Sequence, residues 1–229
     1  MNSILLLSVV LTLFAGQWLI KIWKVAGQEN QVDWGNTWLN RMDGIGRYFC
    51  HTYHGLTKQY IDLPDNGPAI VVGNHVSGLD PLMLAVLCHR PVRFLIAREE
   101  YNRFGFQWLF KAAGCIPVDR VRNPEKALHA ALAQLKAGEV IGIFPHGGIR
   151  WPVQAGSEIK GGAIRLAQRS QCPIYPVFFR GIKLPGFTLP ALLVRSQVKV
   201  KLYPPMYCDT LSYQECKQQL AQILNQDIN

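Results

Sequence analysis

Apolar and polar positions divide the chain into an apolar start and a longer region in which short segments alternate. Residues 3–20 form an uncharged apolar run, and residues 34–57 carry large apolar side chains at helical spacing. After a turn-rich break at 63–68, short apolar runs alternate with helical patterns to the end of the chain. We therefore predict membrane-anchoring helices over residues 1–60 and a globular domain over residues 61–229.

The first apolar run is long enough to reach across most of a bilayer. A helix of 18 residues is about 27 Å long, close to the roughly 30 Å hydrocarbon core. A signal peptide would carry basic residues before the run, whereas Lys21 and Lys24 follow it. By the positive-inside rule these lysines favour a membrane location with the main domain on the cytoplasmic face. A spanning helix, a helix in one leaflet and a buried core helix remain open.

The second stretch, residues 34–57, is aromatic as well as amphipathic. Trp34, Trp38 and Tyr48 are of the residue types that favour the bilayer interface. The pattern fits a helix lying at the membrane surface and equally an ordinary amphipathic helix packed on the domain.

The remaining elements predict an α/β fold. Strands are expected at residues 69–74, 92–97, 115–118, 139–144, 173–179 and 197–203. Helices are expected from Asp80 to about residue 89, from Asn123 to Gly138, over 162–170, and after a capping box of Ser212 and Glu215. Asp80 is the expected N-cap of the first of these helices, with Pro81 at its first position. The alternation indicates a mostly parallel sheet flanked by helices, preceded by the membrane-associated helical segment.

Composition and charge narrow the class of protein. The chain is 49% hydrophobic and only 17% charged, which excludes disordered, collagen-like and coiled-coil classes. A net charge of +9 suits nucleic acid, an anionic membrane or acidic small molecules. The basic residues are dispersed and no nucleic-acid motif occurs, so a nucleic-acid partner is not expected. The six cysteines contain no C-x-x-C pair, and we expect reduced, buried thiols.

One candidate for acid–base chemistry follows the first predicted strand. His75 lies in a loop after that strand, and Asp80 begins the next helix. Such strand ends are where α/β folds place their sites. His75 can accept a proton near neutral pH, and Asp80 can fix its tautomer. Alternatively, Asp80 only caps the helix and the spacing of the two residues arises by chance.

Two further clusters suggest anion binding. Arg120 ends the segment 114–120 and can hold an anionic group through its guanidinium, or it can simply pair with Asp119. In the segment 144–150, glycines allow a sharp turn, and Lys160 precedes a helix that begins at Gly161-Gly162. A fourth segment, 172–177, fits a buried strand that shapes a pocket.

These four segments, in this order, resemble the glycerolipid acyltransferase family, which includes the 1-acyl-glycerol-3-phosphate acyltransferases. The family block N-H-x-x-x-x-D is met by Asn74, His75 and Asp80, and a block similar to G-x-I-x-V-D-R is met by residues 114–120. The fourth block, V-P-I-x-P-V, is met loosely by residues 172–177.

The third family block, F-P-E-G-T-R-S, is altered in this chain. Phe144, Pro145 and Gly147 match it. The four replaced positions carry His146, Gly148, Ile149 and Arg150. Because the family's Glu and Arg help to position the acceptor, the resemblance leaves the identity of the acceptor open: a lysophospholipid or a lipid alcohol without phosphate.

The resemblance implies an O-acyltransferase that moves a fatty acyl group from acyl-CoA or acyl carrier protein to a lipid hydroxyl, with membrane lipids as partners. His75 would remove the hydroxyl proton, and Asp80 would orient His75. The implied substrate-binding residues are Asn74, Arg120, His146, Gly147, Gly148, Arg150 and Lys160. No cofactor and no metal are expected beyond the acyl-thioester co-substrate. Three alternatives remain: an acyl-enzyme on Ser77, a metal site at His75, Asp80, Asp119 and His146, and a non-catalytic lipid-binding protein.

Overall fold

One mainly parallel sheet organises the protein, whose computed structural model describes residues 2–149 and 158–226. The strand order is β3-β2-β4-β1-β5-β6, and only the β5–β6 pair is antiparallel. The strands are β1 (Ala69–Gly73), β2 (Val92–Ala97), β3 (Ile116–Val118), β4 (Val140–Ile143), β5 (Ile174–Arg180) and β6 (Lys199–Leu202). The predicted α/β fold with a mostly parallel sheet is confirmed.

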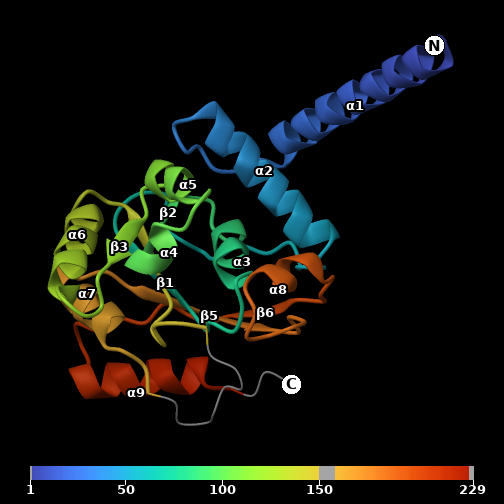
Figure 1. Cartoon of the computed structure of the whole chain (residues 1–229). Coiled ribbons are helices and arrows are strands. Elements are labelled where there is room, and N and C mark those ends of the chain that lie inside the picture. The colour runs from blue at the N-terminus through green and yellow to red at the C-terminus, as the bar shows by residue number, and fades with distance from the viewer. Residues whose placement is uncertain (1, 150–157, 227–229) are drawn as a thin grey trace.

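Helices cover both faces of this sheet (Figure 1). Ile70 and Val72 of β1 pack toward α6 (Pro124–Lys136), α7 (Gly162–Ser170) and α9 (Tyr213–Leu224). Ala69 and Val71 pack on the other face, toward α3 (Asp80–Val86). Because successive side chains of a strand point to opposite faces, an unbroken apolar run fills two cores at once.

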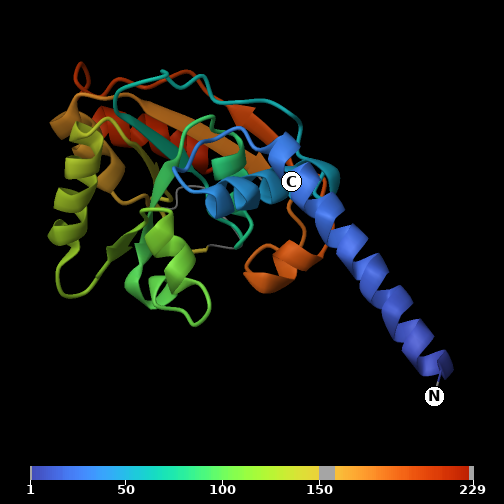
Figure 2. The same ribbon diagram turned by 90° about the horizontal axis from the view of Figure 1, so that it is seen from above.

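The N-terminal helix α1 (Asn2–Glu29) projects away from the body of the molecule in both views (Figures 1 and 2). It extends beyond the predicted run of 3–20 and includes both lysines that follow it. Among the described residues, its segment from Leu7 to Glu29 is long and apolar enough to cross a membrane, and it is almost wholly exposed.

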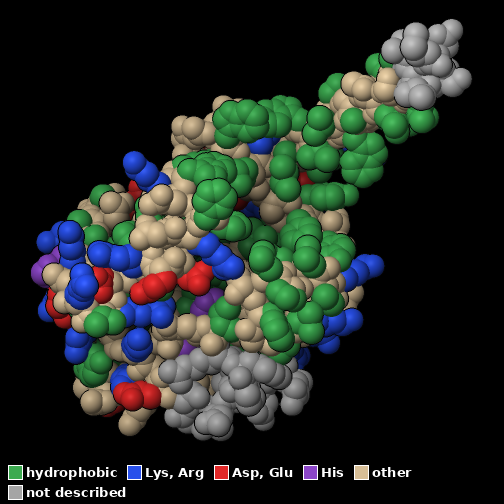
Figure 3. Space-filling view, viewed as in Figure 1, with side chains coloured by type: hydrophobic (Ala, Val, Ile, Leu, Met, Phe, Trp, Pro, Cys, Tyr) green, Lys and Arg blue, Asp and Glu red, His purple; other side chains and the backbone are tan. Residues whose placement is uncertain are grey.

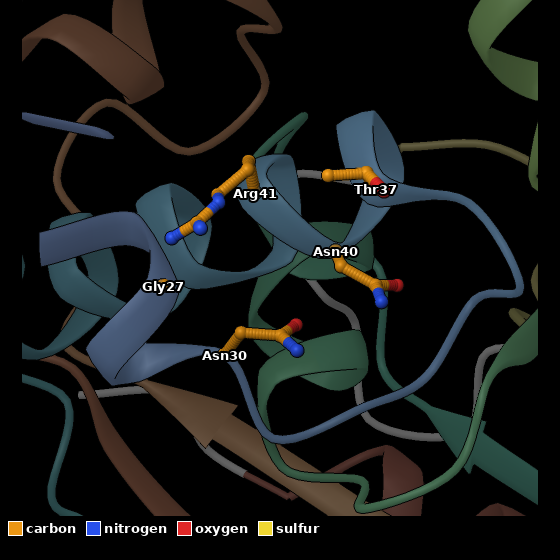
Figure 4. Close-up of a pocket in the computed structure, with 5 residues that line it drawn as sticks. All are labelled: Gly27, Asn30, Thr37, Asn40 and Arg41. Carbon is orange, nitrogen blue, oxygen red and sulfur yellow. The ribbon is translucent and has the colours of Figure 1, made fainter. Parts of the chain in front are cut away.

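Helix α2 (Thr37–Thr52) packs closely against the C-terminal end of α1 and runs at an angle to it. The Arg41 guanidinium donates to the Trp23 carbonyl at 2.9 Å, and Figure 4 shows its side chain reaching from α2 toward the Gly27 turn of α1. Gly44 lies so close to the Ala26 carbonyl that a Cβ there would clash with it. A cavity of about 190 Å³ lies where the two helices meet, lined by Gly27, Asn30, Thr37, Asn40 and Arg41.

The buried face of α2 is anchored in the main domain. Arg47 is fully buried, pairs with Asp43 at 2.6 Å, and donates to the carbonyls of Val86 and Cys88. Cys50 belongs to the same core as β1. The opposite face leaves Trp38, Ile45 and Tyr48 exposed. Helix α2 therefore packs as an amphipathic helix and still presents an apolar face outward.

Three short helices were not predicted: α4 (Arg98–Tyr101), α5 (Gln107–Ala112) and α8 (Leu189–Leu193). One predicted cap is wrong, because Leu79 is the N-cap of α3 and Asp80 is its first residue. The Asp80 carboxylate instead accepts hydrogen bonds from loop N–H groups that precede the helix.

The expectation of six reduced cysteines is wrong for one pair. Cys208 and Cys216 form a disulfide, because the turn before α9 brings their Cα atoms to 5.9 Å. The remaining cysteines are free and buried: Cys50, Cys88, Cys115 and Cys172. Burial raises the pKa of the Cys50 and Cys88 thiols to about 12, because an apolar interior disfavours the thiolate.

Candidate active site

The predicted site residues lie after strands whose carboxyl ends meet at one edge of the sheet. His75 follows β1, Arg120 follows β3 and Gly147 follows β4. Parallel pairing brings the corresponding ends of these strands together, so residues far apart in sequence share this edge.

His75 and Asp80 form a direct side-chain pair. The His75 Nδ1 atom lies 2.9 Å from Asp80 Oδ2, within hydrogen-bond distance. Asp80 is fully buried, whereas the His75 side chain remains 16% exposed. No described residue hydrogen-bonds the His75 Nε2 atom. A carboxylate on Nδ1 holds that nitrogen as the N–H donor and leaves Nε2 as a base for an incoming substrate.

Asp80 also organises the loop that carries His75. Its Oδ2 atom accepts hydrogen bonds from the backbone N–H of Val76 at 2.6 Å and of Ser77 at 2.8 Å. Its Oδ1 atom accepts from the Ser77 hydroxyl at 2.9 Å. The carboxylate therefore fixes the loop backbone and the imidazole together. Ser77 is buried and its hydroxyl donates a hydrogen bond to Asp80, so this hydroxyl is not placed to act as a nucleophile.

The Phe144 ring supports the imidazole from one side. The two rings stack with centroids 4.4 Å apart and planes 26° apart. Gly73 makes room for this arrangement, because a Cβ there would lie 3.1 Å from the Phe144 ring. From the sequence, Phe144 is only a motif match, although its position at the end of the apolar run of β4 is a signal that could identify it.

A second support for the His75 loop comes from the connection between β5 and β6. The Gly78 N–H donates to the Phe187 carbonyl at 3.1 Å, and the Gly186 N–H donates to the Val76 carbonyl at 2.7 Å. A Cβ on Gly78 would lie within 3 Å of Thr188 atoms. This contact could not be predicted from the sequence, since nothing in the pattern links segments more than 100 residues apart.

Beside the His–Asp pair lies a cleft of about 590 Å³ that brings Arg120, Gly147 and Lys160 together. Phe144 lines the cleft as well as stacking on His75, so it connects the two features. Gly147 has a φ of +76°, and a Cβ there would meet the Lys160 amine at 2.7 Å. Glycine thus allows both the left-handed turn and the close approach of the lysine.

The cleft carries excess positive charge. Lys217 pairs with Glu158 at 2.8 Å, and Arg165 lies 3.9 Å from Glu125. Arg120 and Lys160 make no ion pair with any described residue. Figure 3 shows Lys and Arg side chains, with Asp and Glu side chains among them, over α6 and α7, and hydrophobic side chains over α1, α2, α5 and α8. Unpaired cations in a concave site suit an anionic group.

The alternative pairing of Arg120 with Asp119 is wrong. Asp119 accepts hydrogen bonds from the N–H groups of Arg122 and Val121, and it pairs with Arg98 at 3.3 Å. The hydrogen bond from Arg122, together with the nearby Arg98 charge, lowers the pKa of the Asp119 carboxyl. Asp119 therefore has other partners, and Arg120 lines the cleft without pairing with it.

Three predicted substrate-binding residues do not line this cleft. The buried Asn74 amide exchanges two hydrogen bonds with the Phe179 backbone, at 2.9 and 2.7 Å, and so joins the ends of β1 and β5. His146 is buried with Nε2 3.0 Å from Asn225 Oδ1. Gly148 follows the turn without lining the cleft. Arg150 lies outside the described residues. We infer a structural role for Asn74.

The metal alternative has no ligand set in the described part of the chain. Among residues 2–149 and 158–226, no group of three His, Cys, Asp or Glu side chains is placed to hold an ion. Asp80 is committed to the loop and Asp119 to Arg98.

The described residues combine an α/β fold with a hydrogen-bonded histidine–aspartate pair and a cationic cleft. The model of the Acyltransferase family matches residues 53–180, more than half of the chain, and the chain belongs to this family. The resemblance drawn from the four sequence segments is thereby confirmed, and with it the class of O-acyltransferases acting in lipid metabolism.

Individual relatives agree with this assignment. The chain is 23% identical over 171 residues to the 1-acyl-sn-glycerol-3-phosphate acyltransferase of Bacillus subtilis, covering 73% of this chain and 82% of that protein. It is 32% identical over 120 residues to a probable 1-acyl-sn-glycerol-3-phosphate acyltransferase of Mycoplasma genitalium, covering 50% and 44% of the two chains. The crystal structure of the 1-acyl-sn-glycerophosphate (LPA) acyltransferase PlsC from Thermotoga maritima has the same fold, with a TM-score of 0.57 at 17% identity, over 83% of this chain and 80% of that one.

Proposed function

We propose that this enzyme transfers a fatty acyl group from acyl-CoA or acyl carrier protein to the free hydroxyl of 1-acyl-glycerol 3-phosphate, which yields phosphatidate. The observation that carries the proposal is the His75–Asp80 pair, at 2.9 Å, placed beside a cleft with unpaired cations. The names of the relatives support the choice of acceptor.

The proposed chemistry is direct transfer. His75 Nε2 takes the proton of the acceptor hydroxyl while the hydroxyl oxygen attacks the thioester carbonyl carbon. The resulting tetrahedral intermediate collapses, the C–S bond breaks, and the departing thiolate recovers the proton from His75. Asp80 stabilises the imidazolium between these two steps. No nucleophilic serine is required, in keeping with the buried, bonded hydroxyl of Ser77.

The cleft is the proposed site of the acceptor phosphate. Arg120 contributes a planar guanidinium and Lys160 a flexible ammonium, and both are exposed and unpaired among the described residues. Phosphate recognition uses both kinds of cation. Phe144 lines this cleft and its ring stacks on His75, so a headgroup bound in the cleft would place the acceptor hydroxyl toward the proposed base.

The proposed location is a membrane, with the main domain on the cytoplasmic face. Helix α1 is exposed over nearly its whole length and apolar enough to insert, which supports attachment at this end. Lys21 and Lys24 favour the cytoplasmic side for everything that follows. An enzyme held there meets its lipid acceptor in the plane of the bilayer and its thioester donor from the cytoplasm.

A second candidate keeps the reaction and changes the acceptor to another lysophospholipid or to a phosphate-free lipid alcohol. The altered third block favours it. Ile149 stands where the family has Arg, and His146 contacts Asn225 of the C-terminal segment instead of the cleft. The two candidates differ in whether transfer needs the acceptor phosphate.

The deciding experiment supplies the full-length protein, in vesicles, with radiolabelled acyl-CoA or acyl carrier protein thioesters. The acceptors are glycerol 3-phosphate, lysophosphatidate, other lysophospholipids, monoacylglycerol and diacylglycerol. Lysophosphatidate is expected to give the fastest product formation, and the His75→Ala variant is expected to form product about 10²–10⁴-fold more slowly. Product on monoacylglycerol but not on lysophosphatidate would establish the second candidate. Binding of lipid without any turnover would identify a non-catalytic protein.

A further inference from the structure

An exposed apolar surface surrounds the short helix α8, outside the cleft. We define the α8 surface by its exposed apolar side chains Leu184, Phe187, Leu189, Leu193 and Val194. Leu193 is 75% exposed and Phe187 is 55% exposed. Five large apolar side chains within eleven residues form more than the scattered exposure normal for a protein surface.

Cations stand at both ends of the α8 surface. Arg180 and Lys183 precede it and Arg195 follows it, all three are exposed, and residues 180–195 contain no acidic side chain. None of the three makes an ion pair within the part of the chain that the structure describes. An apolar centre with flanking Lys and Arg is the pattern of a segment lying in the interface of an anionic bilayer.

The α8 surface is continuous with the N-terminal helices. The Tyr53 hydroxyl, just beyond α2, donates to the Leu193 carbonyl at 2.6 Å, and His54 Nε2 lies 3.2 Å from the Leu192 carbonyl. Hydrophobic side chains over α1, α2 and α8 lie on the same face of the molecule (Figure 3). A bilayer that receives α1 therefore lies on the side to which α8 presents its apolar residues.

The same segment supports the His75 loop. Its Phe187 carbonyl accepts from the Gly78 N–H, and its Gly186 N–H donates to the Val76 carbonyl. One side of residues 184–194 thus contacts the loop that carries the proposed base, while the other side is apolar and uncovered.

We propose that the α8 surface is a second membrane contact of this enzyme, one that seats the His75 loop against the lipid that carries the acceptor. The occupant is the interfacial region of an anionic bilayer. The inference rests on the proposed membrane location, and it adds that the main domain touches the bilayer at the active site as well as through α1.

The first test measures where residue 193 lies when the full chain is reconstituted in vesicles of phosphatidylcholine and phosphatidylglycerol. Leu193→Cys carries an environment-sensitive fluorophore, and the free native thiols are buried and stay unlabelled. Tyr207→Cys is the matched control, since Tyr207 is 55% exposed and adjoins Met206, which pairs with Ile174 at the opposite end of β5. The Leu193 label is expected to shift to the blue and to be quenched by spin-labelled acyl chains, whereas the Tyr207 label is not.

The second test links the contact to turnover. In Leu189→Ser/Leu193→Ser, the KM for lysophosphatidate presented in vesicles is expected to rise about ten-fold relative to the KM for a monomeric short-chain acceptor. Tyr207→Ser is expected to leave that ratio unchanged. A label at residue 193 as exposed as that at 207, or an unchanged ratio in the double variant, would overturn the inference. The fluorescence measurement needs no turnover, so an enzyme inactive on every acceptor would defeat the proposed function while residue 193 still reported the membrane contact.

Discussion

The two halves of the site are built in different ways. At the end of β1, the His75 loop is held by Asp80 from within, by Phe144 from one side and by the Phe187 carbonyl from another. At the ends of β3 and β4, the cleft cations Arg120 and Lys160 are exposed and lack ion pairs with described residues. We call the first the fixed half, because several contacts hold the His75 loop. We call the second the open half, because its two cations are exposed and lack such partners among the described residues.

This difference follows from what each half has to do. A general base works only within a narrow range of distance and angle, so its loop must be fixed before the substrate arrives. A phosphate can be held by charge from several directions, and long cationic side chains adjust to it. The altered third block falls in the open half. Under the proposed function, the altered block lies in the part that meets the acceptor, and the part that carries the base matches the family block.

The strongest test of the fixed half is Asp80→Ala, compared with Asp119→Ala at the end of β3. Removing the Asp80 carboxylate leaves the buried N–H groups of Val76 and Ser77 without an acceptor, at about 1–3 kcal/mol each. We expect the free energy of unfolding to fall by about 3 kcal/mol or more, with acyl transfer down by about 10²-fold or more. Asp119→Ala removes a carboxylate that is 16% exposed but whose partners Val121, Arg122 and Arg98 are exposed, and it is expected to cost less than about 1 kcal/mol.

Denaturant unfolding in detergent, followed by tryptophan fluorescence, measures the two free energies. Equal losses in the two variants would show that the two strand ends are not differently built.

The open half is tested by Arg120→Ala and Lys160→Ala. Each removes a cation from the cleft and is expected to raise the KM for lysophosphatidate about ten-fold, the effect of one charge-assisted contact, with kcat nearly kept. Lys126→Ala is the matched control, because Lys126 is an exposed cation on α6 that does not line the cleft. Steady-state kinetics at fixed ionic strength measure the split. An equal change in KM in all three variants would show that KM depends only on the total charge of the protein. That result would argue against a phosphate site in the cleft.

Thiol reactivity distinguishes the two halves by their burial. Burial raises the pKa of the Cys88 thiol, just beyond α3, to about 12. Burial likewise raises the pKa of the Cys115 thiol, just before β3, to about 11. Because only the thiolate reacts, both thiols are expected to resist alkylation at pH 8. As the pH rises through 9 and 10, Cys115 is expected to react faster than Cys88, because Cys115 is less completely buried. Mass spectrometry of alkylated peptides gives the two rates, and faster reaction of Cys88 would reverse the proposed order of burial.

The sign of the corresponding stability effect is also fixed. The folded state keeps these thiols protonated at a pH where the unfolded chain has ionised them. Below the unfolded thiol pKa of about 8.5, both states keep the thiols protonated, so the thiols make no pH-dependent contribution to stability there. As the pH rises from there toward 12, the free energy of unfolding decreases.

Much of the fold could be predicted because its signals are local. The unbroken apolar run of β1 reveals a strand buried on both faces, and Asn123 caps α6 where the sequence places it. The helices α4, α5 and α8 were missed because four to six residues carry too little periodicity to identify a helix. Asp80 was expected as an N-cap because an acid before proline usually caps, whereas here the buried carboxylate turns back to Val76 and Ser77.

The site was predictable where one short segment carries both partners. His75 and Asp80 are five residues apart, so their pairing could be expected from the sequence alone. The contacts of Phe144 and of residues 186–187 with the His75 loop could not, because tertiary packing brings those segments together. For the same reason Asn74 was placed among the substrate-binding residues, although its partner is the Phe179 backbone, 105 residues away.

The central claim is that His75 activates the acceptor hydroxyl, and a single-turnover measurement tests it most directly. Wild type and His75→Ala are mixed in vesicles with saturating acyl thioester and lysophosphatidate, and phosphatidate formation is followed by rapid quench. Circular dichroism and the unfolding midpoint establish that the variant is folded. We predict a decrease of about 10²–10⁴-fold in the rate of the chemical step. A folded His75→Ala variant that forms phosphatidate at the wild-type rate would contradict the account.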